Sequence, residues 1–204
     1  STGGIFNVSL TVTNANGTKS TTTTNYITIV GPTAIPLQEG FQGTAFLPAG
    51  WMFYSVTNDG QWEQSTNVGG YAQSTKCAFF DNFNQDLTGK RYVMRTQAYD
   101  LTNADSALLV FDVAYAQYSN ANSDTLIISA STDCGLTWTN IYYNGGFSLA
   151  TAPNLTAIAF VPASFQWRTD TVLLDQFAGF DRVQISFENK ADYGQIMYLD
   201  NINI

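Results

Sequence analysis

An acidic residue inside an apolar strand is the feature of this sequence that most strongly suggests specific chemistry. Asp200 lies within Tyr198-Leu-Asp-Asn-Ile202, close to the end of the 204-residue chain. An unpaired carboxylate in a protein core is costly, so Asp200 needs a cation or strong hydrogen-bond donors beside it. Together with Glu39, near the start of the same predicted domain, it suggests a structural calcium site that joins the two ends of the domain. The alternative is that Glu39 is solvated and that Asp200 caps a turn or accepts backbone N–H bonds.

The sequence offers little for catalysis. It contains no histidine, which excludes Ser-His-Asp and Cys-His catalysis, zinc sites with histidine ligands and histidine proton shuttles. A pair of carboxylates could serve a glycosidase, but no acidic residue has a spacing that singles it out. We therefore predict that this chain has no catalytic residue. The acidic residues considered are Asp133, which is better interpreted as a turn residue, Asp170, Asp175, Asp181, and Glu188, the outward residue of a strand.

Composition and charge favour an extracellular β protein. Hydrophobic residues make up 45% of the chain, whereas charged residues make up only 12%, about half the usual share. The polar surface therefore consists of Thr, Ser, Asn, Gln and Gly, a mixture typical of strands and turns. The net charge of −8 and the scattered eight basic residues argue against nucleic-acid binding. No segment has the roughly 20 apolar residues of a membrane span, so we expect no membrane insertion.

The two cysteines, Cys77 and Cys134, could form a disulfide if the protein is exported. Such a bridge would close a loop of roughly 57 residues and stabilise the fold by about 4 kcal/mol. The alternative is two separate buried thiols, and the sequence leaves both open.

The hydrophobic pattern predicts a hairpin followed by a sandwich. Residues 1–30 alternate between apolar and polar side chains around the turn Asn14-Ala-Asn-Gly17, which predicts a two-stranded hairpin. A hairpin alone is marginal in water, so it should pack on another part of the protein. Residues 31–36 form a stiff linker. Residues 37–204 alternate short strands and turns with no long helix, which predicts an antiparallel sandwich. The expected strands are 107–118, 124–131, 138–143, 171–174, 183–187 and 196–204.

Two family resemblances extend this interpretation. Residues 1–30 resemble the last two strands of a PKD domain, an immunoglobulin-like module, through Phe6-Asn-Val-Ser-Leu-Thr-Val-Thr-Asn-Ala-Asn-Gly17 and Asn25-Tyr-Ile-Thr-Ile29. Residues 37–204 resemble the MAM-like jelly-roll modules of Bacteroidetes exported proteins, of the cleaved-adhesin and choice-of-anchor J type. The matching stretches occur in the family's order: Glu39-Gly-Phe-Gln-Gly43, Leu47-Pro-Ala-Gly-Trp51, Asp59-Gly-Gln-Trp62, Phe111-Asp-Val-Ala-Tyr115, Ser131-Thr-Asp-Cys-Gly-Leu-Thr-Trp138, Leu149-Ala-Thr151 and Tyr198-Leu-Asp-Asn-Ile202.

The resemblance implies an antiparallel jelly-roll β-sandwich that is exported through the type IX secretion route to the cell surface or the medium. It also implies a neighbouring catalytic or adhesive module, of which a pappalysin-type metalloprotease is one kind. In such jelly rolls the first and last strands lie close together, and a bound Ca²⁺ ties them to one loop. By this resemblance Glu39 and Asp200 are assigned directly as calcium ligands. Asp81 and Asn82 of the loop Phe80-Asp-Asn-Phe83 are assigned less directly.

Aromatic residues offer a second kind of site, because the apolar face of a sugar ring packs on an aromatic ring. We expect Trp51, Trp62 and Trp138 to be core residues, since they lie in the family motifs. The better candidates for an exposed glycan site are four tyrosines. Two of them are adjacent, so one of that pair must face outward in a strand. The four are Tyr115, Tyr118, Tyr142 and Tyr143.

Three short segments resemble the O-glycosylation pattern of Bacteroidetes exported proteins. They would place glycans on Ser106, Thr125 and Thr171, each of which must then be exposed at the surface.

These observations predict a non-catalytic adhesion or binding accessory module that recognises a glycan or an extracellular protein. The alternative is a structural spacer that stabilises a neighbouring domain of a secreted multidomain enzyme.

Overall fold

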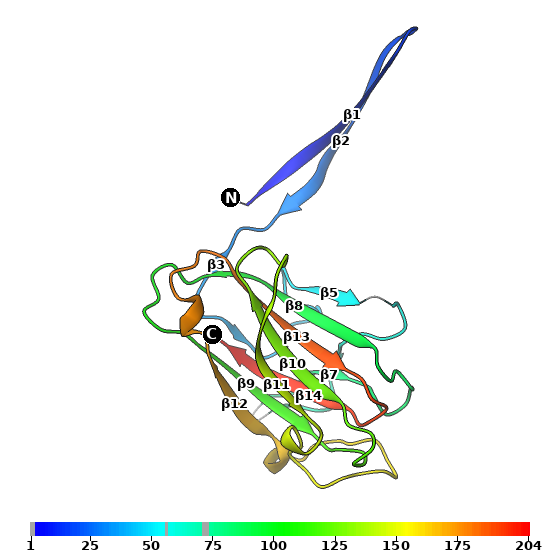
Figure 1. Ribbon diagram of the computed structural model, residues 1–204, viewed down its shortest axis with the longest axis vertical. Helices are drawn as coiled ribbons and strands as arrows, with labels where there is room; N and C mark the ends of the chain where they lie inside the picture. Colours follow the sequence, from blue (N-terminus) through cyan, green and yellow to red (C-terminus); the bar gives the residue numbers. More distant parts are fainter. Residues whose placement is uncertain (1–2, 56, 71–73) are drawn as a thin grey trace.

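Two β-sheets pack face to face in the computed structural model, which describes residues 3–55, 57–70 and 74–204 (Figure 1). Within those ranges every helix is a short 3-10 turn. The prediction of an all-β sandwich without a long helix is therefore confirmed. The three turns are η1 (Gly146–Ser148), η2 (Ser164–Gln166) and η3 (Asp175–Phe177).

The first sheet, named here the β13 sheet, has the strand order β11-β10-β13-β8-β3, and β5 pairs with β8 on the same side as β3. All its pairs are antiparallel except β3 with β8. Its strands are β3 (Thr33–Ala34), β5 (Met52–Ser55), β8 (Arg91–Asp100), β10 (Thr125–Ser131), β11 (Thr139–Gly145) and β13 (Val183–Lys190).

The second sheet, named here the β14 sheet, has the order β12-β9-β14-β7-β6, with β4 paired to β14. Glu39 of β4 lies opposite Ile202 of β14, and the backbones of Leu37 and Ile204 exchange hydrogen bonds of 3.0 and 3.2 Å. The two ends of the sandwich domain are thus joined. The strands are β4 (Gln38–Glu39), β6 (Glu63–Ser65), β7 (Cys77–Phe80), β9 (Leu108–Tyr115), β12 (Arg168–Leu173) and β14 (Met197–Asn203).

Aromatic side chains fill much of the space between the sheets. Trp51 stacks on Phe187 with ring centroids 6.4 Å apart. Trp62 has none of its surface exposed and packs edge-on against Phe80, with centroids 5.8 Å apart. The expectation that these two tryptophans belong to the core is confirmed. Trp138 is different: it is half-buried and lies on the outside of the β13 sheet, against Arg95.

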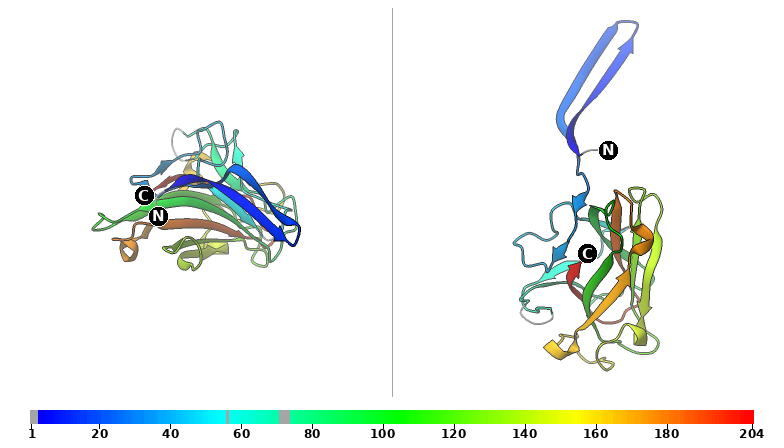
Figure 2. Two further views of the ribbon diagram at one scale, coloured as in Figure 1. Left: turned by 90° about the horizontal axis from the view of Figure 1, so that it is seen from above. Right: turned by 90° about the vertical axis from the view of Figure 1, so that its left-hand side faces the viewer.

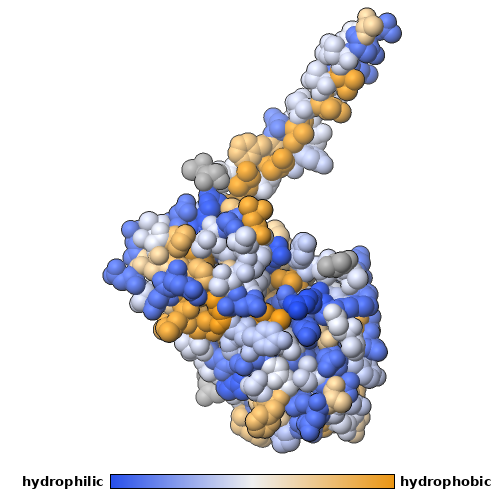
Figure 3. Space-filling model, in the orientation of Figure 1, coloured by the Kyte–Doolittle hydropathy of each residue, from blue (hydrophilic) through white to orange (hydrophobic). Residues whose placement is uncertain are grey.

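The hairpin extends away from the sandwich (Figures 1 and 2). It consists of β1 (Gly4–Asn14) and β2 (Gly17–Ile29), which confirms the predicted hairpin. One face carries paired hydroxyl groups, such as Ser9 with Thr22 at 2.7 Å. The other carries the apolar row of β1, which stays exposed to solvent and appears as orange side chains in Figure 3. Among the described residues, the hairpin therefore lacks the packing partner expected for it. The row is Phe6, Val8, Leu10 and Val12.

The predicted disulfide is wrong. Cys77 is fully buried in β7 of the β14 sheet, where its thiol donates to the carbonyl of Val68 at 3.2 Å. Cys134 is exposed in the loop after β10 of the β13 sheet, and both cysteines are free. Cys77 thus lies inside a strand of one sheet and Cys134 on the surface beside the other, and the two thiols are not bridged.

One of the three predicted glycosylation sites is also wrong. Ser106 and Thr171 are exposed, as the modification requires. Thr125 is only 8% exposed, because the backbone of Gly145 on the neighbouring strand lies over it. A Cβ added at Gly145 would be 2.5 Å from the Thr125 hydroxyl, so no room remains for a glycan.

Candidate functional site

Two buried carboxylates lie side by side on the outer face of the β14 sheet. Asp200 of β14 is paired with Asp112 of β9, and directly paired residues of antiparallel strands share one face. Asp200 is 0% exposed and Asp112 is 4% exposed. Oδ1 of Asp200 accepts the N–H of Asn201 at 2.8 Å, but the buried Oδ2 has no hydrogen-bond partner of good geometry. The expectation that Asp200 lies in the core is thus confirmed, and its bond from the backbone N–H of Asn201 agrees with the alternative given for it.

Burial and hydrogen-bond donors both act on this pair. Burial raises the pKa of Asp200 to about 6, and the negative charge of Asp112 adds to the rise, while the Ser74 hydroxyl lowers it. The Asn201 side chain bridges the two strands by donating to Asp112 at 2.7 Å. The backbone of Gly70 packs so closely against Asp200 that a Cβ there would overlap Oδ2, at 1.8 Å. The Thr169 hydroxyl also donates to Asp112, at 2.5 Å, so the pair lies among amide and hydroxyl groups with no basic side chain paired to it in the described residues.

The other predicted calcium ligands lie apart from Asp200. Glu39 is paired with Ile202, a core residue, so its backbone adjoins β14 while its carboxylate lies on the inner side of the sheet. Burial raises the pKa of Glu39, and its Oε1 accepts the N–H of Phe41 at 2.5 Å. Within the described residues, no three acidic, cysteine or histidine side chains gather to hold a metal. A cation at Asp200 would need further oxygens from amides and the backbone.

Asp81 and Asn82 are at the far end of β7. Phe80 pairs with Met197 and Ala78 with Leu199, which puts Asp81 roughly four residues, or about 13 Å, from Asp200 along the sheet. Asp81 caps its own loop by accepting the N–H groups of Phe83 and Asn84 at 2.9 and 3.0 Å. Asn82 is buried and donates to the carboxamide of Asn189 at 3.1 Å. Both side chains have structural roles that do not involve Asp200.

Tyr115 is wrongly predicted as an exposed ligand-binding residue. Its side chain is fully buried, because the hydroxyl holds a second buried acid, Asp124. Tyr115 donates to Oδ2 of Asp124 at 3.0 Å, and the N–H groups of Asp192 and Gln195 donate at 2.8 and 2.9 Å. Asp124 therefore fastens the loop before β14 to the start of β10.

Asp124 should make stability depend on pH. Burial outweighs the three donors and raises its pKa from 3.8 to about 6. A carboxyl group with a raised folded-state pKa contributes stability that is fully present below pH 3.8 and lost as the pH rises through about 6. The expected loss is about 3 kcal/mol. Urea unfolding of the wild type and of Asp124→Asn at pH 4 and pH 7 measures this loss of stability. The contributions of the other carboxylates cancel when the unfolding free energy of the variant is subtracted from that of the wild type. The stability advantage of the wild type should shrink from pH 4 to pH 7, and an unchanged difference would contradict the prediction.

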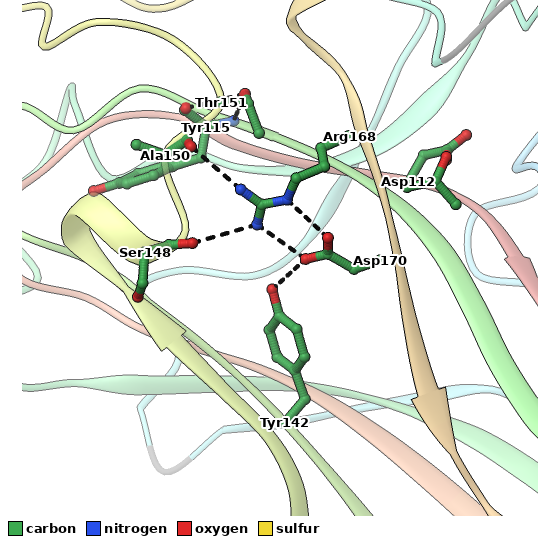
Figure 4. A network of polar contacts seen from close by, with 9 residues as sticks. Asp112, Tyr115, Tyr142, Ser148, Ala150, Thr151, Arg168 and Asp170 are labelled. Atoms are coloured by element: carbon green, nitrogen blue, oxygen red, sulfur yellow. Dashed lines mark hydrogen bonds and ion pairs between the residues drawn. The ribbon is translucent and has the colours of Figure 1, made fainter.

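Tyr142 points away from any ligand surface and into a network between β11 and β12 (Figure 4). Its hydroxyl donates to Asp170 at 2.6 Å, and the guanidinium of Arg168 donates to both oxygens of Asp170 at 2.7 and 2.9 Å. Arg168 also reaches the carbonyls of Ser148 and Ala150. This arrangement joins strand β12 to the loop after β11, and Tyr142 has a structural role. Tyr118 is half-buried, so only Tyr143, 58% exposed, is fully available for stacking among the four predicted tyrosines.

The outer face of the β13 sheet holds an aromatic cluster that the sequence interpretation missed. Arg95 of β8 lies between two rings: its guanidinium carbon is 4.2 Å from the ring centroid of Tyr54 and 4.8 Å from that of Trp138. Tyr54 is 53% exposed at the edge of the sheet. Beside it is a hollow to which the exposed carboxamides of Asn58 and Gln61 contribute. An exposed aromatic ring beside amide donors and acceptors suits a ligand with both apolar and hydroxylated surfaces.

Comparison with known proteins identifies the fold. No protein-family model matches the chain, and no curated protein matches it significantly. Solved structures match well. The K1 cleaved adhesin domain of Lys-gingipain from Porphyromonas gingivalis superimposes with a TM-score of 0.60 at 20% identity, over 83% of this chain and 96% of that domain. The K2 domain gives 0.57 at 16% identity, over 83% and 98%. This chain has the cleaved-adhesin jelly-roll fold.

The cleaved-adhesin fold is shared with carbohydrate-binding modules. A structure described as showing the promiscuous specificity of carbohydrate-binding modules from the β-sandwich superfamily has a TM-score of 0.52 at 13% identity, over 98% of this chain and 73% of that one. The predicted jelly roll is thereby confirmed as a fold. No helix of the described residues is long and apolar enough to cross a membrane.

Proposed function

We propose that this chain is a non-catalytic binding module of an exported cell-surface or secreted protein, and that it recognises a glycan on the outer face of the β13 sheet. The observation that carries the proposal is the exposed ring of Tyr54 beside a hollow lined by Asn58 and Gln61. A pyranose can pack its apolar face on the ring while its hydroxyl groups bond the carboxamides. The shared fold with adhesin domains and carbohydrate-binding modules supports a binding role.

We further propose that Ca²⁺ stabilises the module at the pair Asp200 and Asp112. Two adjacent buried carboxylates without a basic partner among the described residues need an added positive charge or a proton. The carboxamide of Asn201 and nearby backbone carbonyls would complete the oxygen shell that Ca²⁺ takes. The ion would tie β9 to β14, and its role would be structural.

Binding of neutral polysaccharides to the immobilised chain tests the glycan proposal. We expect the wild type to bind at least one neutral polysaccharide and Tyr54→Ala to weaken that binding about tenfold or more, because the stacking surface is lost. Tyr143→Ala is the matched control, since it removes an equally exposed tyrosine from the opposite edge of the same sheet. If Tyr143→Ala weakens binding and Tyr54→Ala does not, the site lies at β11. If the wild type binds no glycan, a spacer role is favoured.

A further inference from the structure

Arg95 is a cation without an anionic partner. Among the described residues its guanidinium lies over two aromatic rings and takes part in no ion pair, and its buried Nε has no hydrogen-bond partner. An arginine in a folded protein usually pairs its planar N–H edge with a carboxylate. Here the guanidinium lies over the rings of Tyr54 and Trp138, and these aromatic contacts leave its N–H groups without an anionic partner.

The loop after β10 holds this arrangement in place. Trp138 donates its indole N–H to the carbonyl of Gly135 at 3.0 Å, which fixes the ring over Arg95. Gly135 has a φ of 84°, a conformation that favours glycine, and it packs close to the end of Arg95. The carboxylate of Asp133 in this loop already accepts hydrogen bonds from the Ser131 hydroxyl and from the hydroxyl and N–H of Thr137, at 2.6–2.9 Å. The loop therefore orients Arg95 without neutralising it.

The surrounding surface is locally positive in a chain of net charge −8. The pattern of buried and outward residues places Arg91 and Arg95 of β8 and Lys190 of β13 on the outer face. The acids among the outward residues of these two strands are Glu188, which is paired with Arg91, and Asp100 at the end of β8, which accepts the N–H of Thr102. A ligand that approaches this face thus meets basic groups, although most of the protein repels anions.

We propose that the glycan bound at the Tyr54 hollow carries an anionic group, a carboxylate or a sulfate, which Arg95 binds. This inference rests on the proposed function and specifies its ligand class. Tyr54 contacts Arg95 and also borders the hollow, so one sugar unit can pack in the hollow while the charged group of the same or the next unit reaches the guanidinium. A planar carboxylate matches the two parallel N–H donors of arginine. The exposed ring of Tyr54 and the carboxamides of Asn58 and Gln61 favour a sugar polymer, which can stack on the ring and bond the amides. An acidic peptide would require neither group for its carboxylates to bind Arg95.

The test compares polymers that share a backbone and differ in charge. Polygalacturonate and its methyl ester form one pair, and dextran sulfate and dextran form the other, so the two pairs distinguish carboxylate from sulfate. Binding to the full chain is measured by isothermal titration calorimetry at 50 and 300 mM NaCl. We expect the charged member of at least one pair to bind about tenfold or more tightly than the neutral one at low salt. Arg95→Gln should remove that preference, and Arg95→Lys, which keeps the charge but not the planar fork, should keep part of it.

Arg91→Gln is the matched control, because Arg91 lies on the same strand and face but is already paired with Glu188. It should keep the preference, and thermal melts should verify that each variant is folded. Equal binding of charged and neutral polymers by the wild type, or an unchanged preference in Arg95→Gln, would overturn the inference. If neutral binding still depends on Tyr54, the proposed function survives that result. Tighter binding of poly-glutamate than of any glycan would overturn the glycan assignment itself.

Discussion

Calcium at saturating concentration should raise the Tm of the wild-type chain by about 5–10 °C, and the substitution Asp200→Asn should remove most of that rise. The expected rise corresponds to about 2.7 kcal/mol of binding energy at 100 times the dissociation constant. It depends on Asp200 because both the carboxylate and its neighbour Asp112 are buried, and the Oδ2 atom of Asp200 lacks a partner. Differential scanning calorimetry in Ca²⁺ and in EDTA measures the shift.

The order of stability should reverse without calcium. In EDTA the variant Asp200→Asn should melt at or above the wild-type Tm, since it removes one of two buried like charges that nothing neutralises. Asp81→Asn is the control, because Asp81 was predicted as a ligand but caps its own loop at the far end of β7. It should respond to calcium like the wild type. A response that disappears in Asp81→Asn and persists in Asp200→Asn would contradict the assignment, and no response in the wild type would exclude the ion.

Strands rich in β-branched or aromatic residues and bounded by turn residues were predicted well. Residues 124–131 correspond to β10, and residues 183–187 lie within β13. The longest strand of the sandwich, β8, was missed. Tyr92, Met94 and Tyr99 face inward, but the register shifts between Arg95 and Ala98, and this irregularity breaks the period of two. Such a bulge depends on the partner strand β13, which no local pattern reveals.

The candidate sites were predictable only in part, for a similar reason. Asp200 stood out as an acid within an apolar strand. Asp112, between Phe111 and Val113, has the same signature, and the same rule would have found it. The pairing of the two acids depends on the register of β9 with β14. The cluster of Tyr54, Arg95 and Trp138 brings together three separate segments, and only the folded chain shows that Arg95 lies between two rings.

Gly194→Ala should be among the most destabilising single substitutions in the chain, with a loss of about 3 kcal/mol or more. Gly194 precedes the N–H group of Gln195 that bonds Asp124. An added Cβ would overlap Oδ2 of Asp124 and would lie 3.0 Å from the Tyr115 hydroxyl. The backbone would have to move away, and the buried carboxylate would lose donors that keep it tolerable in the core. The glycine is thus required by close approach to a buried acid and not by an unusual backbone angle.

The control for this prediction is Gly43→Ala. The nearest atom to a Cβ at Gly43 is the carbonyl oxygen of Ala45 at 3.6 Å, an ordinary contact, and Gly43 is exposed. That variant should stay within about 0.5 kcal/mol of the wild type in urea unfolding. If Gly194→Ala is equally mild, the loop before β14 is free to shift without cost, and Asp124 does not hold it. If Gly194→Ala is strongly destabilising but becomes mild in an Asp124→Ala background, the overlap with the carboxylate is the cause, because two substitutions that act through one contact are not additive.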